Sequence, residues 1–66
     1  MKNRLRVLRA ERSWSQQELA TRSGVSRQAI NAVETGKFDP SLPLAMKLAQ
    51  IFDTSVESIF QFEEDV

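Results

Sequence analysis

The chain has 66 residues, equal numbers of basic and acidic side chains, and neither cysteine nor histidine. These absences exclude disulfides, thiol nucleophiles, imidazole bases and the usual zinc ligands, so we expect no enzyme, no metal and no cofactor. No apolar run approaches the roughly 20 residues that span a bilayer, and the N-terminus lacks the apolar stretch of a signal peptide, so we expect a cytoplasmic protein with one domain over residues 1–66.

Residues 3–12 form the first predicted helix. Leu5 and Leu8 lie three residues apart, which places them on one helical face, while arginines cover much of the remaining surface. The segment is therefore amphipathic, and its apolar face is expected to pack toward the core.

Each of the four helices that follow begins at a serine suited to capping the free amides of a first turn. These caps are Ser15, Ser26, Ser41 and Ser55. Glu18 completes a capping box with the first cap, and apolar pairs occupy the staple positions around the first two caps. Those pairs are Trp14 with Leu19 and Val25 with Ile30. The starts predict helices over residues 16–23 and 27–35, a fourth helix from residue 42, and a very short fifth over residues 56–60.

Glycines and prolines separate these segments. Gly24 follows the second helix and Gly36 follows the third, where a left-handed residue commonly ends a helix. Pro40 biases the residue before it toward extended geometry, and Pro43 is tolerated in a first helical turn. Because no segment alternates strongly enough for a strand pair, the expected fold class is all-α, a compact five-helix bundle without a sheet.

The expected core combines the apolar stripes of the last two helices with aromatic residues. The stripes consist of Leu44, Leu48 and Ile51, followed by Val56, Ile59 and Phe60. Four aromatic residues are expected in the core or at its edge, namely Trp14, Phe38, Phe52 and Phe60. The acidic residues 63–65 are expected to be solvated.

Charge is distributed unevenly along the chain. Residues 1–37 hold eight basic side chains and three acidic ones, whereas residues 38–66 hold one basic side chain and six acidic ones. The zero net charge alone argues against nucleic-acid binding. The asymmetry between the halves favours it, although solvated surfaces also produce such imbalances.

Two short helices joined across a glycine match the generic helix-turn-helix pattern, whose second helix lies in the major groove. Small, turn-forming and packing residues occur together where this motif needs them, namely Ala20, Gly24, Ile30 and Val33. The segment SQQELATRSGVSRQAINAVETGKFDPSLPLAMKLAQIFDTSVESIF resembles the Cro and phage-repressor (XRE-like) helix-turn-helix family. The resemblance implies a lambda-repressor-like domain that binds a palindromic double-stranded DNA operator as a homodimer and acts as a transcriptional repressor.

The same resemblance implies that the third helix reads bases, and its helical wheel gives an independent view. With Ile30 and Val33 inward, steps of about 100° place Gln28, Asn31, Ala32 and Thr35 on the opposite face. Amide side chains can bind adenine, arginine can bind guanine, and alanine can meet a thymine methyl. The expected base-contacting residues are Gln28 first, then Arg27, Asn31 and Ala32. Arg27 suits a phosphate equally well, and the alternative for the whole face is solvated helix surface.

Phosphate contacts are expected near the start of the second helix, where free amides and the helix dipole favour an anion. By resemblance, Gln16 matches the family's phosphate-contacting glutamine and Lys37 matches a basic position used on the DNA backbone. The full predicted set is Gln16, Gln17, Ser26, Thr35 and Lys37. Ordinary exposed loop residues remain the alternative for the last two. Solvated surface is favoured for the first-helix arginines Arg4, Arg6 and Arg12.

Arg9 and Glu34 each share the apolar face of a predicted helix. Arg9 follows Leu5 by four residues, and Glu34 follows Ile30 by four. A buried charge without a partner costs several kcal/mol, so the two are predicted to form a structural ion pair. The resemblance implies the same role.

The C-terminal tail, residues 61–66, carries the last predicted surface. Phe62 with Phe60 and Val66 is a candidate apolar seam between two subunits. The competing function is a protein-interaction adaptor or antitoxin-like module whose C-terminal apolar surface binds a partner protein. No small-molecule ligand is expected, because no separate sensing domain follows the helices.

Overall fold

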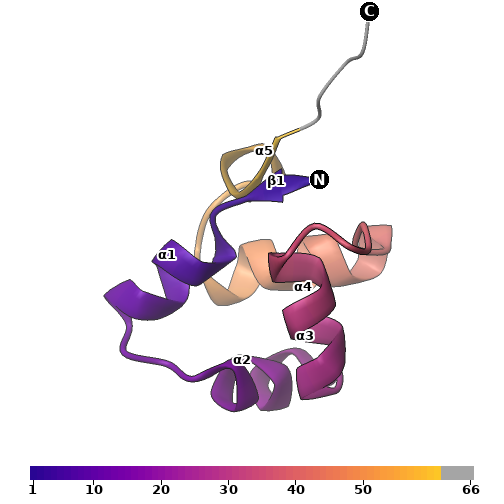
Figure 1. The fold of residues 1–66 in the computed structure, drawn as a ribbon. Coiled ribbons are helices and arrows are strands. Elements are labelled where there is room, and N and C mark those ends of the chain that lie inside the picture. The colour runs from indigo at the N-terminus through magenta and orange to yellow at the C-terminus, as the bar shows by residue number, and fades with distance from the viewer. Residues whose placement is uncertain (62–66) are drawn as a thin grey trace, which may run out of the picture.

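The computed structural model describes residues 1–61, which fold into a helical globule with a small strand pair at one end (Figure 1). The elements in chain order are β1 (Lys2–Asn3), α1 (Leu5–Glu11), α2 (Gln16–Ser23), α3 (Arg27–Glu34), α4 (Leu42–Ile51), α5 (Val56–Ile59) and β2 (Phe60–Gln61). The predicted fold class, a compact five-helix bundle, is confirmed. Within the described part of the chain, no helix combines the length and apolar character needed to cross a bilayer.

The expectation that the fold has no sheet is wrong. β1 pairs antiparallel with β2, with Lys2 opposite Gln61 and Asn3 opposite Phe60. The backbone amide of Arg4 extends the pairing by donating to the carbonyl of Ile59 at 2.9 Å. Strands of two residues are too short to show alternation, so the sequence carries no local signal for them. The pairing also begins α1 at residue 5 instead of residue 3.

The predicted helix caps are confirmed. Each serine hydroxyl accepts a hydrogen bond from the backbone amide three residues later, at distances of 3.0, 3.0, 3.2 and 3.1 Å. These acceptors are Ser15, Ser26, Ser41 and Ser55 in chain order. Gly24 and Gly36 adopt the left-handed region, with φ of 74° and 80°. The helix limits therefore follow local rules of capping and chain reversal.

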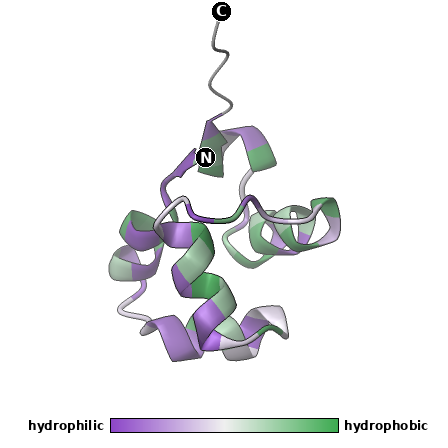
Figure 2. Cartoon of the chain, turned by 45° about the vertical axis from the view of Figure 1, so that its right-hand side comes forward, coloured by the Kyte–Doolittle hydropathy of each residue, from purple (hydrophilic) through white to green (hydrophobic). Residues whose placement is uncertain are grey.

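The core draws one fully buried large side chain from every helix. These side chains are Leu5, Leu19, Ile30, Leu48 and Ile59. Hydrophilic and hydrophobic residues alternate along the helices, as expected where each helix has one face inward (Figure 2). Phe38 contradicts its predicted place at the core, because 69% of it is exposed in the loop between α3 and α4.

Candidate nucleic-acid interface

α2 and α3 form the paired helices that hold the candidate site. The turn between them is fixed by Gly24, whose amide donates to the carbonyl of Ala20 at 2.9 Å. The buried hydroxyl of Ser23 donates to the carbonyl of Leu19 at 2.7 Å, so this side chain is paired inside the turn. Ala20 is fully buried and has only a methyl side chain, so it leaves room for close approach in the interior.

α3 is anchored by its inward face and presents a polar outward face. Ile30 is 0% exposed and Val33 is 5% exposed, so both lie in the core. On the other side Arg27, Gln28 and Asn31 are exposed, and Ala32 is half-buried between the two faces. The orientation expected from the helical wheel is therefore the orientation found.

The residues predicted for phosphate contact lie at the ends of α2 and α3. Gln17 and Thr35 are exposed and make local hydrogen bonds, Gln17 to the Thr21 hydroxyl at 3.3 Å and Thr35 to the carbonyl of Asn31 at 2.9 Å. The Ser26 hydroxyl accepts its capping bond and keeps its proton to donate elsewhere. Lys37 is exposed directly after the left-handed Gly36.

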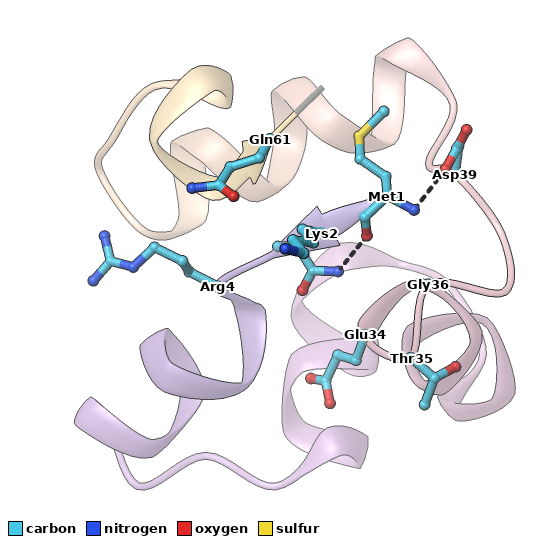
Figure 3. Close-up of a pocket in the computed structure, with 9 residues that line it drawn as sticks. Met1, Lys2, Arg4, Glu34, Thr35, Gly36, Asp39 and Gln61 are labelled. Carbon is cyan, nitrogen blue, oxygen red and sulfur yellow. Dashed lines mark hydrogen bonds and ion pairs between the residues drawn. The ribbon is translucent and has the colours of Figure 1, made fainter. Parts of the chain in front are cut away.

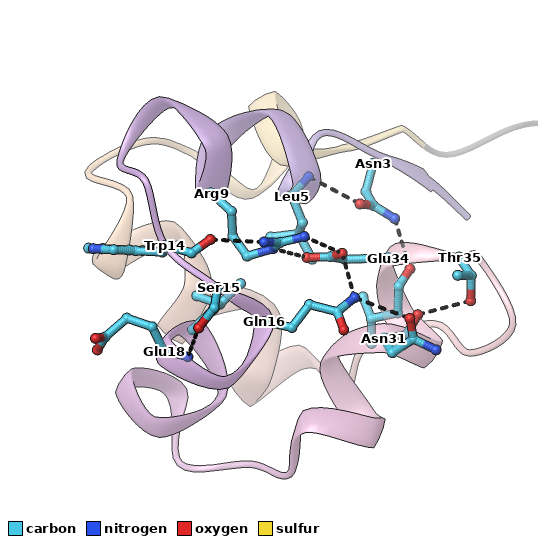
Figure 4. Close-up of polar contacts among 12 residues, drawn as sticks. Asn3, Leu5, Arg9, Trp14, Ser15, Gln16, Glu18, Asn31, Glu34 and Thr35 are labelled. Carbon is cyan, nitrogen blue, oxygen red and sulfur yellow. Dashed lines mark hydrogen bonds and ion pairs between the residues drawn. The ribbon is translucent and has the colours of Figure 1, made fainter.

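Arg9 and Glu34 lie together between α1 and α3, as the sequence analysis expects (Figure 4). Arg9 Nε lies 2.6 Å from Glu34 Oε2, and Arg9 Nη2 donates to Oε1 at 3.1 Å. Arg9 Nη1 also donates to the carbonyl of Trp14 at 2.9 Å, which ties the loop before α2 to the same guanidinium. The Glu34 side chain is 0% exposed and that of Arg9 is 14% exposed, so the pair is almost entirely shielded from water.

Both partners of this pair hold their charged forms. Burial of Glu34 alone would raise its pKa, but hydrogen bonds from Arg9 and Gln16 and the charges of Arg9 and Arg6 outweigh burial and leave the pKa below its ordinary value. The hydrogen bond to Glu34 raises the pKa of Arg9 against the opposing effect of burial. The site therefore contains a fixed carboxylate at neutral pH.

Gln16 has a role that the sequence analysis missed. Its Nε2 donates to Glu34 Oε1 and to Asn31 Oδ1, each at 3.1 Å (Figure 4). The first residue of α2 is thus bonded to the outward face of α3. The partners are 15 and 18 residues away along the chain, so no periodic pattern within one helix reveals the contact.

Arg12 differs from its predicted place on solvated surface. Its Nη2 donates to the carbonyl of Phe52 at 3.1 Å, and its guanidinium lies 4.9 Å from the centroid of the Phe52 ring. The centroid of the Trp14 ring lies 5.6 Å from the guanidinium of Arg12 and 4.2 Å from that of Arg22. Attraction between cations and aromatic rings accounts for this stack, which joins the α1–α2 loop to the end of α4.

The predicted subunit seam is only partly within the described residues. Phe60 is 7% exposed and packs in the core of its own chain, as its place in the apolar stripe of the fifth helix predicts, and this burial leaves little of its ring for a second subunit. Phe62 and Val66 lie outside the described residues. The large apolar side chains that the structure does expose include Val7, Phe38, Leu42 and Met46.

An open cavity of about 680 Å³ lies between β1 and the C-terminal end of α3 (Figure 3). The Met1 amino group lies 3.2 Å from Asp39 Oδ1 on one side, and Asn3 Nδ2 donates to the carbonyl of Val33 at 2.9 Å on another. The carboxylate of Glu34 on this wall is already bonded to Arg9. Residues 1–61 contain no group of three acidic side chains placed to hold a metal ion.

The paired helices, the capped turn and the exposed polar face of α3 define a helix-turn-helix protein. Residues 5–59 match the profile of the helix-turn-helix family, and the chain belongs to that family, which confirms the assignment made from the sequence.

Known proteins resemble this chain over most of its length. An uncharacterized HTH-type transcriptional regulator from Methanocaldococcus jannaschii is 51% identical over 65 residues, covering 98% of both chains. One from Bacillus subtilis is 42% identical over 65 residues, again covering 98% of both. Among solved structures, the restriction-modification controller protein C.AhdI from Aeromonas hydrophila superposes with a TM-score of 0.78 at 38% identity, covering 86% of each chain.

Proposed function

We propose that this protein is a sequence-specific double-stranded DNA-binding transcriptional regulator that acts as a repressor. α3 enters the major groove and α2 lies across the sugar-phosphate backbone. The observation that carries the proposal is the outward orientation of Gln28 and Asn31 while Ile30 and Val33 fix the helix beneath them. The names of the relatives from M. jannaschii and B. subtilis, both transcriptional regulators, support the same function.

The proposed DNA contacts divide into base contacts on α3 and phosphate contacts on α2 and at the two ends of α3. The base-contacting residues are Arg27, Gln28, Asn31 and Ala32, which lie on the first two turns of the helix where a recognition helix reaches base edges. The phosphate-contacting residues are Gln16, through its backbone amide at the start of α2, and Gln17, Ser26, Thr35 and Lys37. Phosphate contacts set the register of the protein on the duplex, and base contacts select the sequence.

The proposal includes a homodimer on a palindromic operator. Two copies related by a twofold axis would place their α3 helices about 34 Å apart, one turn of the duplex. Oligomerisation also suits a chain of 66 residues whose core is small and which has no cysteine. The apolar side chains of Leu42 and Met46, one turn apart on α4 and both exposed, supply surface for the second copy.

The proposal is tested by selecting bound duplexes from a random pool. Affinity and salt titrations are then made on the most enriched sequence. We expect Gln28→Ala to relax preference at one base position and cost about 1–3 kcal/mol there. Lys37→Ala should weaken all sequences similarly and flatten the log–log salt slope by about 0.9. Gln50→Ala, an exposed glutamine on α4, is the matched control and should change neither property. Equal behaviour of the first two variants would contradict the division between base and phosphate contacts.

A further inference from the structure

We infer that Gln16 is a positioning residue that holds the side-chain amide of Asn31 with its oxygen inward, so that Asn31 offers a base only a hydrogen-bond donor. This inference rests on the proposed function and narrows it, because it names the kind of base edge that one position of α3 accepts. It also gives Gln16 a role distinct from the phosphate contact expected from the sequence.

The series of hydrogen bonds that orients these amides starts at Arg9, whose guanidinium has donors and no acceptor. It holds the Glu34 carboxylate through Nε at 2.6 Å and Nη2 at 3.1 Å. An ionised carboxylate only accepts hydrogen bonds. The Gln16 amide atom that lies 3.1 Å from Glu34 Oε1 must therefore be its nitrogen, because an oxygen there would face a second acceptor.

The same Gln16 nitrogen then fixes the next amide. It lies 3.1 Å from Asn31 Oδ1, and its second proton needs an acceptor at that point. If the Asn31 amide were reversed, two NH2 groups would face each other at this distance and both would be donors. Asn31 therefore turns its oxygen toward Gln16 and its Nδ2 group away, on the exposed face of α3.

Base edges in the major groove differ in what such a donor can meet. Three bases present an acceptor there: guanine at N7 and O6, adenine at N7, and thymine at O4. Cytosine presents only its N4 amino group, which is a donor. Asn31 therefore disfavours cytosine at the base position that it contacts. Its oxygen accepts the bond from Gln16, so a contact between Asn31 and adenine consists of one hydrogen bond donated by Nδ2.

Gln28 is the internal comparison. It is exposed on the same helix, but no hydrogen bond to residues 1–61 fixes its amide, which can rotate to suit either a donor or an acceptor. The sequence preference of the two amides should therefore respond differently to a change at Gln16.

Asn31→Asp is the sharpest test. The aspartate keeps an oxygen for the bond from Gln16 and replaces the outward donor with an acceptor. The position that Asn31 reads is located first as the one whose preference is lost in Asn31→Ala. At that position, duplex selection with Asn31→Asp should raise the cytosine-to-guanine ratio by tenfold or more. A ratio that stays at the wild-type value would overturn the inference.

Gln16→Met keeps the length of the side chain and removes both amide atoms. It should abolish discrimination against cytosine at the Asn31 position and leave the Gln28 position unchanged. If Gln16 served only as a phosphate contact or as packing, the variant would weaken all sequences alike, and that result would also overturn the inference. Thermal melts of each variant verify that it is folded under the binding conditions.

A measurement without DNA separates failure of this inference from failure of the proposed function. In the free protein, the side-chain NH2 protons of Gln16 should exchange with water more slowly than those of Asn31, because among residues 1–61 only the former donate hydrogen bonds. The reverse order would refute the arrangement. If the wild-type protein enriches no duplex, the proposed function is refuted. The order of the two exchange rates still decides how the amides of Gln16 and Asn31 are oriented.

Discussion

The Glu34 carboxylate on α3 accepts three hydrogen bonds from side chains of α1 and α2, so Glu34→Ala is an informative perturbation. The substitution removes two hydrogen bonds from Arg9 and one from Gln16. The Arg9 side chain, which is 14% exposed in the native protein, then keeps only the carbonyl of Trp14 as a partner among residues 1–61. The lost hydrogen bonds are mainly those between α1 and α3, which this ion pair joins.

The magnitude follows from the burial of the pair. Removing one partner of a buried ion pair costs about 3–5 kcal/mol, because the other charge stays shielded from water without compensation. A domain of this size loses about 4–8 °C in Tm for each kcal/mol, so the melting temperature should fall by roughly 12–40 °C. Much of the stability of so small a domain is lost by such a change.

Thermal and urea unfolding followed by circular dichroism at neutral pH measure this effect. Glu18→Ala is the matched control, because Glu18 pairs with Arg22 at 3.1 Å on the exposed surface, where such pairs contribute under about 1 kcal/mol. Replacing both Arg9 and Glu34 by methionine should recover stability relative to Glu34→Ala. A melting temperature of Glu34→Ala equal to that of Glu18→Ala would refute the reasoning.

Two further predictions concern acid stability and assembly. Folding lowers the pKa of Glu34 below its ordinary value of 4.5, so its stabilisation is present above that pH and is lost as the pH falls through the native pKa. Urea midpoints from pH 7 to pH 2 should therefore decline less steeply in Glu34→Gln than in the wild type, and parallel curves would count against the pairing. In sedimentation equilibrium, the wild type should have the mass of a dimer, and either Leu42→Glu or Phe62→Glu should shift it to a monomer. A monomeric wild type, or two dimeric variants, would rule out these surfaces.

Local signals account for the features that the sequence predicts well. Serine caps and left-handed glycines act within one or two turns, so Ser15, Ser26 and Gly24 could be assigned from their neighbours alone. The inward position of Ile30 and the outward position of Gln28 follow from helical periodicity in the same way.

Contacts between distant segments account for what the sequence does not predict. The strand pair joins Asn3 to Phe60 across nearly the whole chain, and Gln16 bonds to a different helix. Arg12 is drawn from solvent by two aromatic rings that meet only in the folded state. Phe38 is exposed because its loop runs along the surface, a property that hydrophobicity alone does not reveal.

Binding of DNA to the outward face of α3 can be measured by an amide chemical-shift titration of the isotope-labelled protein with its selected duplex. If α3 reads the DNA, we expect the largest shifts in residues 27–37 and in the first turn of α2, with α5 and β1 little changed. Shifts concentrated on α4 and α5, with α3 unaffected, would contradict it.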